Sequence, residues 1–427
     1  MKIAIIGAGF TGLSAAYQLT KKGYEVTVYE KDPSPGGLAI GYQEKGWDWS
    51  LEKHYHHWFT NDNHILNLAK SINYEVIIKR PHTNWYVNGN IYEFDSIPAA
   101  LRFSELTPQD RVRHLATLAL LRFNPFWKPL EKINANTFLP TLMGKKAYRM
   151  LWEPLFANKF GEYADDVSLA WFWARIAKRT QSLAYPSGGF LHFAQALDNH
   201  ISKNGGIIHY QSEIEKIVEN KIIEITFKDI TGKTKKQFFD KCIVTLPSFL
   251  FLKIAPQLPE SYTKKLVRLK GLGATNLVLR LKKPFFPNNT YWLSVADKKS
   301  PVMAIVEHTN FMDKRHYNNE HLLYLGNYVS PEHPYFKMTE TEMISKFDPF
   351  LRKINPSYSK SLIGMKLFKA PFAQPIIPVN YSRIIPPMVT PLSNVILANI
   401  EQVYPWDRGT NYAVELGEKA AKLASQV

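Results

Sequence analysis

The chain has 427 residues, which predicts two or three structural units at roughly 100–200 residues per domain. Hydrophobic residues make up 45% and charged residues 21%, proportions of a packed globular protein that exclude disorder for most of the chain. The single cysteine, Cys242, excludes an internal disulfide framework and a multi-cysteine metal site, and the net charge of +16 favours acidic partners such as phosphates, nucleic acid or an anionic membrane surface.

The N-terminal run of apolar residues predicts a strand rather than a targeting segment. Residues 3–6 are apolar, but glycines begin at Gly7, too early for the apolar region of a signal peptide. No stretch approaches about 18 consecutive apolar residues, so no membrane-spanning helix is expected. We therefore expect a cytoplasmic protein.

The first thirty residues predict a strand–helix–strand unit that binds a dinucleotide. The strand at 3–6 runs into the G-x-G-x-x-G sequence of residues 7–12, apolar residues at helical spacing occupy 13–22, and a second strand over 26–29 ends at Glu30. An acidic residue at that position accepts hydrogen bonds from ribose hydroxyls. The order of these parts makes the glycine motif specific.

Each glycine of the motif has its own expected role. Gly7 permits the tight turn, Gly9 lets a pyrophosphate approach the backbone, and Gly12 lets the helix pack closely on the strand. The N–H groups of the first helical turn then face the phosphates. NAD and FAD share this motif, so the residues after Glu30 decide between the two cofactors.

A second pair of glycines comes directly after the first unit. Gly36 and Gly37 lie shortly after Glu30 and Lys31, which resembles the flavoprotein extension of the motif. That extension usually carries an arginine after the glycines, where this chain has Leu38. The backbone donors remain, so FAD is favoured over NAD.

Together with these glycines, four later segments resemble the superfamily of FAD-containing amine oxidases, protoporphyrinogen oxidases and phytoene desaturases. In chain order they are the turn at 185–190 before a helix, a strand pair at 207–217, a strand at 242–247 that ends in proline, and the C-terminal segment 395–413. The resemblance runs from residue 1 to about 420. It implies an α/β fold in which a Rossmann-like FAD-binding domain of the glutathione-reductase type (1–75, 185–265 and 385–427) is interleaved with an α+β substrate domain (76–184 and 266–384).

The resemblance also implies which residues contact FAD. In the family the C-terminal segment places an acidic residue beside the ribityl chain, where this chain has Asn399 with Glu401 two residues later, and a helix N-terminus under the flavin ring. The implied cofactor-binding residues are Gly7, Gly9, Phe10, Thr11, Gly12, Glu30, Lys31, Gly36, Gly37, Leu38, Ile214, Pro247, Asn399, Glu401, Arg408, Gly409, Thr410 and Asn411.

A histidine-rich stretch supplies the candidate catalytic residues. Lys53, His54, His56 and His57 lie in the segment that passes near the reactive edge of the flavin in the superfamily. They suit proton transfer or substrate contact, and simple packing is the alternative. No carboxylate or cysteine partners cluster with them, so no metal site is expected.

Three further features concern the substrate. Asn276 takes the position of the lysine that the amine-oxidase branch carries near flavin N5, which disfavours amine oxidation. A helix capped by Thr107, with Val112 and Leu121 on its apolar side, ends in the aromatic and basic segment 123–128, which suits either a membrane interface or docking onto the FAD domain. The aromatic residues at 171–173 either line an apolar cleft or pack between helices.

Three functions remain open from the sequence. The leading one is an FAD-dependent oxidoreductase that oxidises or desaturates a C–H bond of a hydrophobic or lipid-like substrate by hydride transfer to flavin N5. The second is a flavin-dependent isomerase of a nucleotide sugar, like UDP-galactopyranose mutase, with Arg149, Arg175 and Arg179 as candidates for binding the diphosphate. The third is a non-enzymatic lipid-binding protein of the GDP-dissociation-inhibitor type.

The partners expected from the sequence are a small-molecule substrate and FAD. Peripheral contact with the anionic inner face of a membrane is the alternative to a freely diffusing cytoplasmic enzyme. Nucleic acid is not expected, because no nucleic-acid-binding module accompanies the positive charge. The substrate, the electron acceptor and the oligomeric state stay open.

Overall fold

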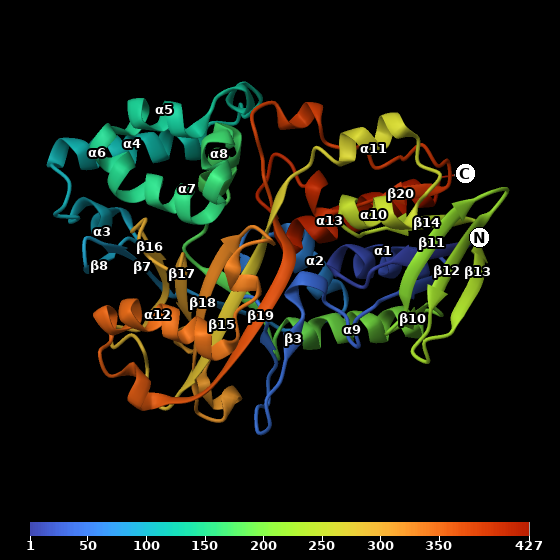
Figure 1. The fold of residues 1–427 in the computed structure, drawn as a ribbon, viewed down its shortest axis with the longest axis horizontal. Coiled ribbons are helices and arrows are strands. Elements are labelled where there is room, and N and C mark those ends of the chain that lie inside the picture. Colours follow the sequence, from blue (N-terminus) through green and yellow to red (C-terminus); the bar gives the residue numbers. More distant parts are fainter. Residues whose placement is uncertain (427) are drawn as a thin grey trace.

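The computed structural model describes residues 1–426 and shows two lobes side by side. One lobe contains a parallel sheet with long helices on one face and a three-stranded sheet with short helices on the other, and it carries both chain termini (Figure 1). The other combines a larger mixed sheet with a group of helices. The fold is thus α/β, with strands of each lobe drawn from distant parts of the chain.

The first lobe is built on a five-stranded parallel sheet in the order β10-β2-β1-β14-β20. Its inner strands read as continuous buried apolar runs, as expected for a parallel sheet covered on both faces. All five strands come from the ranges 1–75, 185–265 and 385–427. They are β1 (Lys2–Ile6), β2 (Glu25–Tyr29), β10 (Ile207–His209), β14 (Lys241–Val244) and β20 (Val395–Leu397).

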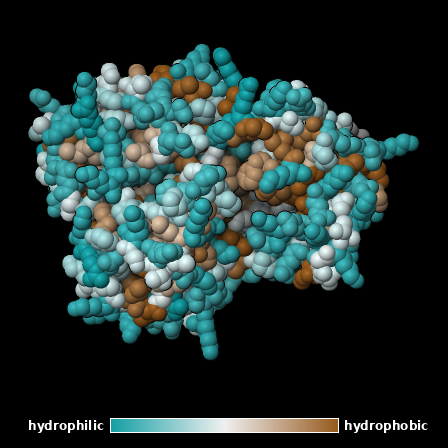
Figure 2. Space-filling model, in the orientation of Figure 1, coloured by the Kyte–Doolittle hydropathy of each residue, from teal (hydrophilic) through white to brown (hydrophobic). Residues whose placement is uncertain are grey.

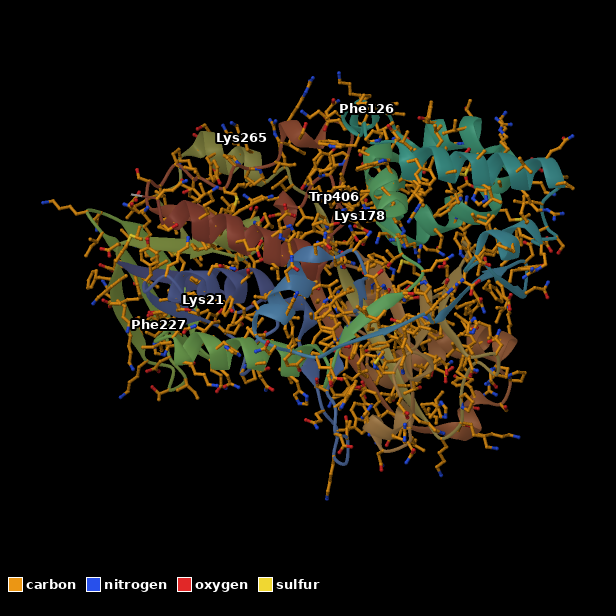
Figure 3. The ribbon with its side chains drawn as sticks, turned by 180° about the vertical axis from the view of Figure 1, so that it is seen from behind. Lys21, Phe126, Lys178, Phe227, Lys265 and Trp406 are labelled. Atoms are coloured by element: carbon orange, nitrogen blue, oxygen red, sulfur yellow. The ribbon has the colours of Figure 1, made fainter. Side chains whose placement is uncertain are left out.

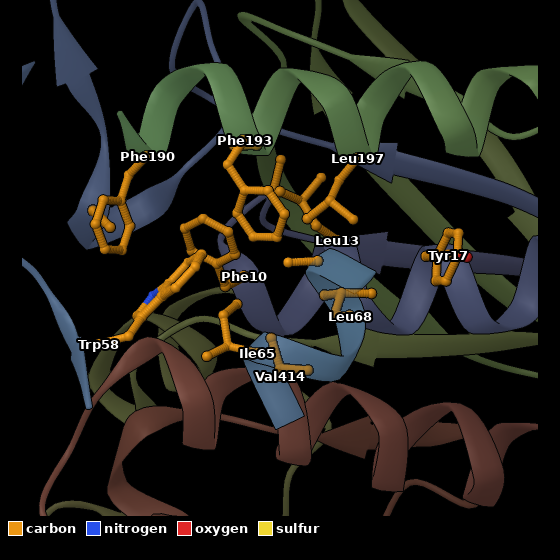
Figure 4. Close-up of a cluster of buried hydrophobic side chains, with 14 of the residues drawn as sticks. Phe10, Leu13, Tyr17, Trp58, Ile65, Leu68, Phe190, Phe193, Leu197 and Val414 are labelled. Atoms are coloured by element: carbon orange, nitrogen blue, oxygen red, sulfur yellow. The ribbon is translucent and has the colours of Figure 1, made fainter. Parts of the chain in front are cut away.

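Helix α1 (Phe10–Thr20) lies between α9 (Phe190–Lys203) and α13 (Thr410–Ala424), with α2 (Asn63–Ser71) alongside (Figure 4). Phe10 stacks on Phe193 with ring centroids 5.7 Å apart. A Cβ at Gly417 of α13 would lie 2.3 Å from the carbonyl oxygen of Thr11, so glycine there permits the close approach of α13 to α1. The helix begins at Phe10, which places the second half of the glycine motif in its first turn.

The expected strand pair at 207–217 is wrong, because its two strands lie in different sheets. β10 joins the parallel sheet, whereas β11 (Glu213–Glu219) pairs with β12 (Ile223–Lys228) in an antiparallel sheet completed by β13 (Thr234–Phe239). The turn between β10 and β11 stays close to the first unit, since Ser212 N–H donates to the carbonyl oxygen of Glu30 at 2.8 Å.

The second lobe is built on a seven-stranded sheet in the order β19-β15-β18-β17-β16-β7-β8. Its strands are β7 (His82–Val87), β8 (Asn90–Glu93), β15 (Gly271–Leu281), β16 (Thr290–Val295), β17 (Ala304–Glu307), β18 (His321–Val329) and β19 (Leu362–Pro375). Its longer helices are α4 (Pro108–Phe123), α5 (Ala135–Met143), α7 (Glu153–Phe160), α8 (Leu169–Ala177) and α12 (Glu340–Ile354).

Short helices and strands complete the fold, and one small sheet joins segments assigned to the two expected domains. In it β9 (Leu183–Pro186) pairs with both β5 (Trp58–Phe59) and β6 (Val76–Lys79), so a division at residues 75 and 184 passes through a sheet. The remaining elements are β3 (Gly41–Tyr42), β4 (Leu51–Glu52), α3 (Ile97–Leu101), α6 (Lys145–Ala147), α10 (Ser248–Ile254) and α11 (Glu260–Leu266).

Helix α4 begins as expected and buries the expected side only in part. Thr107 caps it through a hydrogen bond from Asp110 N–H, with Pro108 at the first position. Its buried residues are His114, Thr117 and Leu121, whereas Val112 is 60% exposed. The expected apolar side is thus confirmed at Leu121 and wrong at Val112, and His114 turns inward because it accepts a hydrogen bond from Trp152 Nε1 at 2.9 Å.

The face of the molecule in Figure 2 is mostly hydrophilic, with hydrophobic areas confined to separate patches. Among residues 1–426, no helix combines the length and the apolar character needed to cross a membrane.

Candidate functional site

The glycine motif at the start of α1 contains two glycines that the fold itself requires and one that it does not. Gly7 has φ of +102°, and a Cβ at Gly12 would lie 1.9 Å from the carbonyl oxygen of Gly7. A Cβ at Gly9 would meet only the Cα of Gly37, at an ordinary 3.6 Å. The space beside Gly9 is therefore open to a ligand.

The first turn of α1 offers free donors at the same place. No side chain caps this helix, and within residues 1–426 the backbone N–H groups of Thr11 and Gly12 have no acceptor. The Phe10 side chain itself is buried in the core, so it does not face this end. Two free N–H groups beside an open glycine fit the pyrophosphate of FAD.

Glu30 lies at the position where the ribose of the cofactor is expected. Its Oε2 accepts from Ala8 N–H at 2.7 Å and its Oε1 accepts from Asp32 N–H at 2.9 Å. Burial raises the pKa of Glu30, and the two backbone donors oppose that rise. A carboxylate offers about four acceptor sites, so about two remain for ribose hydroxyls. Lys31, the next residue, is exposed and forms no hydrogen bond with Glu30.

The second glycine pair is hydrogen-bonded to the turn that contains Gly7 and Gly9. Gly36 N–H donates to the carbonyl oxygen of Ala8 at 3.0 Å, and Gly36 and Gly37 both have positive φ. The two glycine turns thus lie together, as the flavoprotein resemblance implies. Leu38, directly after them, is 36% exposed and lines a small cavity of about 20 Å³.

A second group of expected cofactor residues meets at the start of α10. Glu401 Oε2 accepts from Ser248 N–H at 2.9 Å and from Asn399 Nδ2 at 2.9 Å. Burial raises the pKa of Glu401, and these donors oppose the rise. Pro247 is the N-cap of this helix, while Ile214 lies apart on β11, with its side chain in the core. Asn399 thus orients the acid that stands two residues beyond the usual position.

The N-terminus of α13 forms the third group of expected cofactor residues, and its polar side chains already form hydrogen bonds with other parts of the protein. Thr410 Oγ1 accepts from Trp58 Nε1 at 2.8 Å. Asn411 Oδ1 accepts from the N–H groups of His64 and Ile65 and so caps α2. Within residues 1–426 the backbone N–H groups of Thr410 and Asn411 have no acceptor, and Gly409 adds no side chain. This helix end fits the electron-rich pyrimidine side of a reduced flavin.

A cavity of about 210 Å³ lies where this helix end meets the helices of the second lobe. One wall is made by Arg408, Gly409, Thr410 and Asn411 together with the histidine-rich segment. Four aromatic side chains also line the cavity, Trp152, Phe156, Trp171 and Phe172, so the residues at 171–172 both pack and line a cleft. Tyr55, His56, Tyr328 and Arg408 line both this cavity and the small one.

The structure separates the four catalytic candidates. His56 and His57 line the large cavity, His54 lines the small one, and Lys53 lines neither. Burial lowers the pKa of His54 and His57 to about 3 and that of His56 to about 4, so all three rings are neutral near pH 7. In residues 1–426 no three His, Cys, Asp or Glu side chains converge to hold a metal.

Hydrogen bonds assign roles to ring nitrogens of His56 and His54. His56 Nδ1 lies 2.6 Å from the carbonyl oxygen of His54, which requires the proton on Nδ1 and leaves Nε2 as an acceptor. His54 Nδ1 lies 2.6 Å from Asn276 Nδ2. The Oδ1 of Asn276 is buried without a partner in residues 1–426, so the small cavity retains an unused acceptor that fits a donor on a bound group.

Several residues of the cavity were not found from the sequence. Lys159, Lys178, Asp62 and Tyr328 all line it, but each is a lone residue outside any motif. Of the three arginine candidates, Arg175 and Arg179 line the cavity, whereas Arg149 is exposed and does not.

Comparison with known proteins identifies the family. Residues 10–424 match the family described as flavin containing amine oxidoreductase. The chain belongs to this family. FAD is therefore its cofactor, in agreement with the glycine turns, Glu30 and the free helix ends described above.

The individual proteins that this chain resembles have names that refer to different activities. Zeta-carotene desaturase of Zea mays is 32% identical over 133 residues, which cover 28% of this chain and 23% of that one. The chain thus matches less than a quarter of that relative's length. An oxidoreductase from Methanosarcina mazei (22% identity, 99% and 100% of the two chains, TM-score 0.76) and reduced UDP-galactopyranose mutase (17%, 100% and 96%, TM-score 0.76) share the fold.

Proposed function

We propose that the protein is an FAD-dependent oxidoreductase that removes a hydride from a C–H bond of a substrate held in the large cavity. One observation carries this proposal: the uncapped N-terminus of α13 and a group of aromatic side chains line the same cavity. A substrate in it would contact both the flavin-binding side and an apolar surface.

The residues of the chain supply binding, orientation and exclusion of water. FAD, when bound, supplies the acceptor for the hydride. The first turn of α1 and Glu30 hold its pyrophosphate and ribose, and Glu401 stands ready for a hydroxyl of its ribityl chain. The aromatic wall excludes water from the substrate. His56 Nε2, the free acceptor on the cavity wall, takes up a substrate proton.

A nucleotide-sugar isomerase is the second candidate, because Arg175 and Arg179 both line the cavity. The two candidates differ in their electron balance. An oxidoreductase leaves its flavin reduced when oxygen is absent, whereas an isomerase that starts from reduced flavin returns it unchanged.

Anaerobic absorbance measurements on the FAD-loaded protein test this proposal. We expect a lipid-like C–H donor, tested both as an uncharged carotene and as an amphiphilic acid, to bleach the flavin in proportion to the product formed. Conversion of UDP-galactopyranose by the reduced protein, with no change in flavin absorbance, would support the isomerase instead. A purified protein that is folded but takes up no FAD would contradict both.

We also propose that the segment after α4 meets an anionic membrane. Phe123 is 80% exposed and Phe126 is 74% exposed, and Arg122 and Lys128 beside them are exposed as well. Basic and aromatic residues together suit the interface of an anionic bilayer.

This segment is connected to the cavity. Trp173 Nε1 donates to the carbonyl oxygen of Asn124 at 2.8 Å, and the ring of Trp173 stacks on Trp406 at 5.2 Å. Lys178, which lines the cavity, lies 4.4 Å over the ring of Trp406. Figure 3 shows Phe126 on the same side of the molecule as this pair. A lipid-like substrate would thus pass from the membrane to the cavity by a short route.

A further inference from the structure

The large cavity carries an excess of positive charge. Its lining contains five cationic side chains and two carboxylates, a formal excess of three positive charges while the histidines are neutral. They are Lys159, Arg175, Lys178, Arg179 and Arg408 against Asp62 and Asp407. Salt screens charges in such a partly buried site much less than charges on an exposed surface. The positive charge therefore acts on any ligand that enters the cavity.

Two of the cationic side chains, Arg175 and Arg408, have ion-pair or hydrogen-bond partners within the protein. Arg175 forms an ion pair with Asp407 at 3.5 Å, and the carboxylate of Asp407 also accepts from Trp171 Nε1 at 3.1 Å. Arg408 donates to Gln374 Oε1 at 2.9 Å and to the hydroxyl of Tyr328. These contacts fix the two arginines in the cavity wall.

Arg179 is not satisfied in this way. Within residues 1–426 its guanidinium has no hydrogen-bond acceptor and no carboxylate at ion-pair distance. Burial and the like charge of Arg175 lower the pKa of Arg179 to about 9. An unpaired cation in such a place is costly, and an anion placed between Arg175 and Arg179 would remove much of that cost.

Lys159 occupies a site that suits an ammonium ion. Its Nζ lies 4.7 Å from the ring centroid of Tyr328, 5.5 Å from that of Trp171 and 5.8 Å from that of Phe160. Proteins use such groups of rings to recognise cationic ligands. Here the Lys159 side chain fills the place: burial lowers the pKa of its ammonium group and Asp407 opposes that fall. An amine entering the cavity thus finds the place where its own charge would bind already occupied.

Resting on the proposed function, we propose that this cavity binds the anionic head group, a carboxylate or a phosphate, of its substrate. Arg179, Arg175 and Lys159 are the specificity-determining contacts. The apolar part of the substrate lies against the aromatic wall of Trp152, Phe156 and Phe172. The C–H bond to be oxidised thus belongs to an amphiphilic acid rather than to an amine or an uncharged hydrocarbon.

Calorimetric titration of the FAD-loaded protein with four small aromatic probes tests this proposal. Benzoate and phenyl phosphate carry the two kinds of anion, benzamide is the neutral analogue of benzoate, and benzylamine is the cation. We expect at least one anion to bind ten-fold or more tightly than benzamide, and benzylamine to bind most weakly. The ratio of benzoate to phenyl phosphate affinity distinguishes a carboxylate from a phosphate substrate.

Two variants and one control locate the site. We expect Arg179→Gln, and independently Lys159→Met in case the first variant does not fold, to weaken the preferred anion at least ten-fold. Arg149→Gln removes the same charge from an exposed position outside the cavity and leaves the affinity unchanged. Equal binding of benzamide and both anions, or an equal loss in Arg149→Gln, would overturn the proposal.

The two proposals fail separately in this design. Flavin content is measured on the same samples by releasing the cofactor with denaturant. A protein that binds the anion but contains and takes up no flavin would refute the oxidoreductase while leaving the anion site intact. A flavin-loaded protein without anion preference would refute only the anion site.

Discussion

Gly9 and Gly12 differ in what a side chain would meet, and this difference separates binding from folding. A side chain at Gly9 enters the open space beside the first turn of α1, whereas a Cβ at Gly12 clashes with the carbonyl oxygen of Gly7. We expect Gly9→Val to lose FAD while keeping the fold. The matched variant Gly12→Ala should instead unfold at lower urea concentration.

Circular dichroism and released flavin, measured on both variants, check this prediction. Full flavin occupancy in folded Gly9→Val protein would refute the placement of the pyrophosphate. A Gly12→Ala protein as stable as the wild type would show that the close packing of α1 against the turn is not needed.

Buried histidines make stability depend on pH. Burial lowers the pKa of five of them to about 3 or 4, against about 6.5 in the unfolded chain. They are His54, His56, His57, His114 and His308. Below pH 6.5 the unfolded state binds more protons at these sites, so the free energy of unfolding falls as pH falls from about 6.5 towards 4.

Four buried carboxyls act in the opposite direction, among them Glu30 and Glu401, whose pKa burial raises as described above. Burial raises the pKa of Glu52 to about 7 and that of Asp62 to about 6, so the folded state binds more protons there over the same range. The five histidines, each with its pKa lowered to about 3 or 4, outweigh these carboxyls, so we expect a net loss of stability in acid. Urea unfolding at pH 7 and pH 5 measures it, and equal midpoints would contradict the neutral state of the histidines.

At the scale of single elements, α13 supports α2 by a side chain that the family resemblance assigns to the cofactor. Asn411 Oδ1 caps α2 through His64 and Ile65, while its backbone N–H remains free for the flavin. We expect Asn411→Ala to lower the free energy of unfolding by roughly 0.5–2 kcal/mol, as for lost helix caps, and to leave flavin content unchanged.

The control for this variant is Asn220→Ala, at an exposed asparagine whose side chain makes no hydrogen bond within residues 1–426. It should unfold like the wild type. Loss of flavin in Asn411→Ala without loss of stability would mean that the side chain binds the cofactor directly.

The elements that the sequence predicts well are those defined by local pattern. The strand at 3–6, the glycine turn and the strand ending at Glu30 can be read from residue order alone, and the structure has all three. The placement of β10 and β11 in different sheets could not be predicted, because it depends on pairing with strands far away in the sequence. Lys159 was missed for the same reason: its aromatic neighbours come from α7, α8 and β18.

At the scale of the whole molecule, the membrane proposal predicts which surface makes the contact. We expect the protein to sediment with vesicles containing anionic lipid but not with neutral vesicles, and to be released as salt screens the surface charge. Phe123→Ser with Phe126→Ser should abolish this binding, since both rings are exposed at the end of α4.

A single exposed ring in the other lobe provides the control. Phe238 is 53% exposed on β13, and Phe238→Ser should leave vesicle binding unchanged. No binding of the wild type to anionic vesicles at low ionic strength would refute the proposal. Equal loss in the Phe238 variant would show that the contact is not specific to the α4 segment.

The cofactor itself is the central claim about the molecule, and its identity and amount in the purified protein test that claim most directly. Denaturation releases the bound nucleotide, and chromatography distinguishes FAD from FMN and NAD. We expect FAD, in equal molar amount to the chain after incubation with excess cofactor. A folded protein that releases NAD, or that neither contains nor takes up FAD, would contradict the assignment of the glycine turns and Glu30 to FAD.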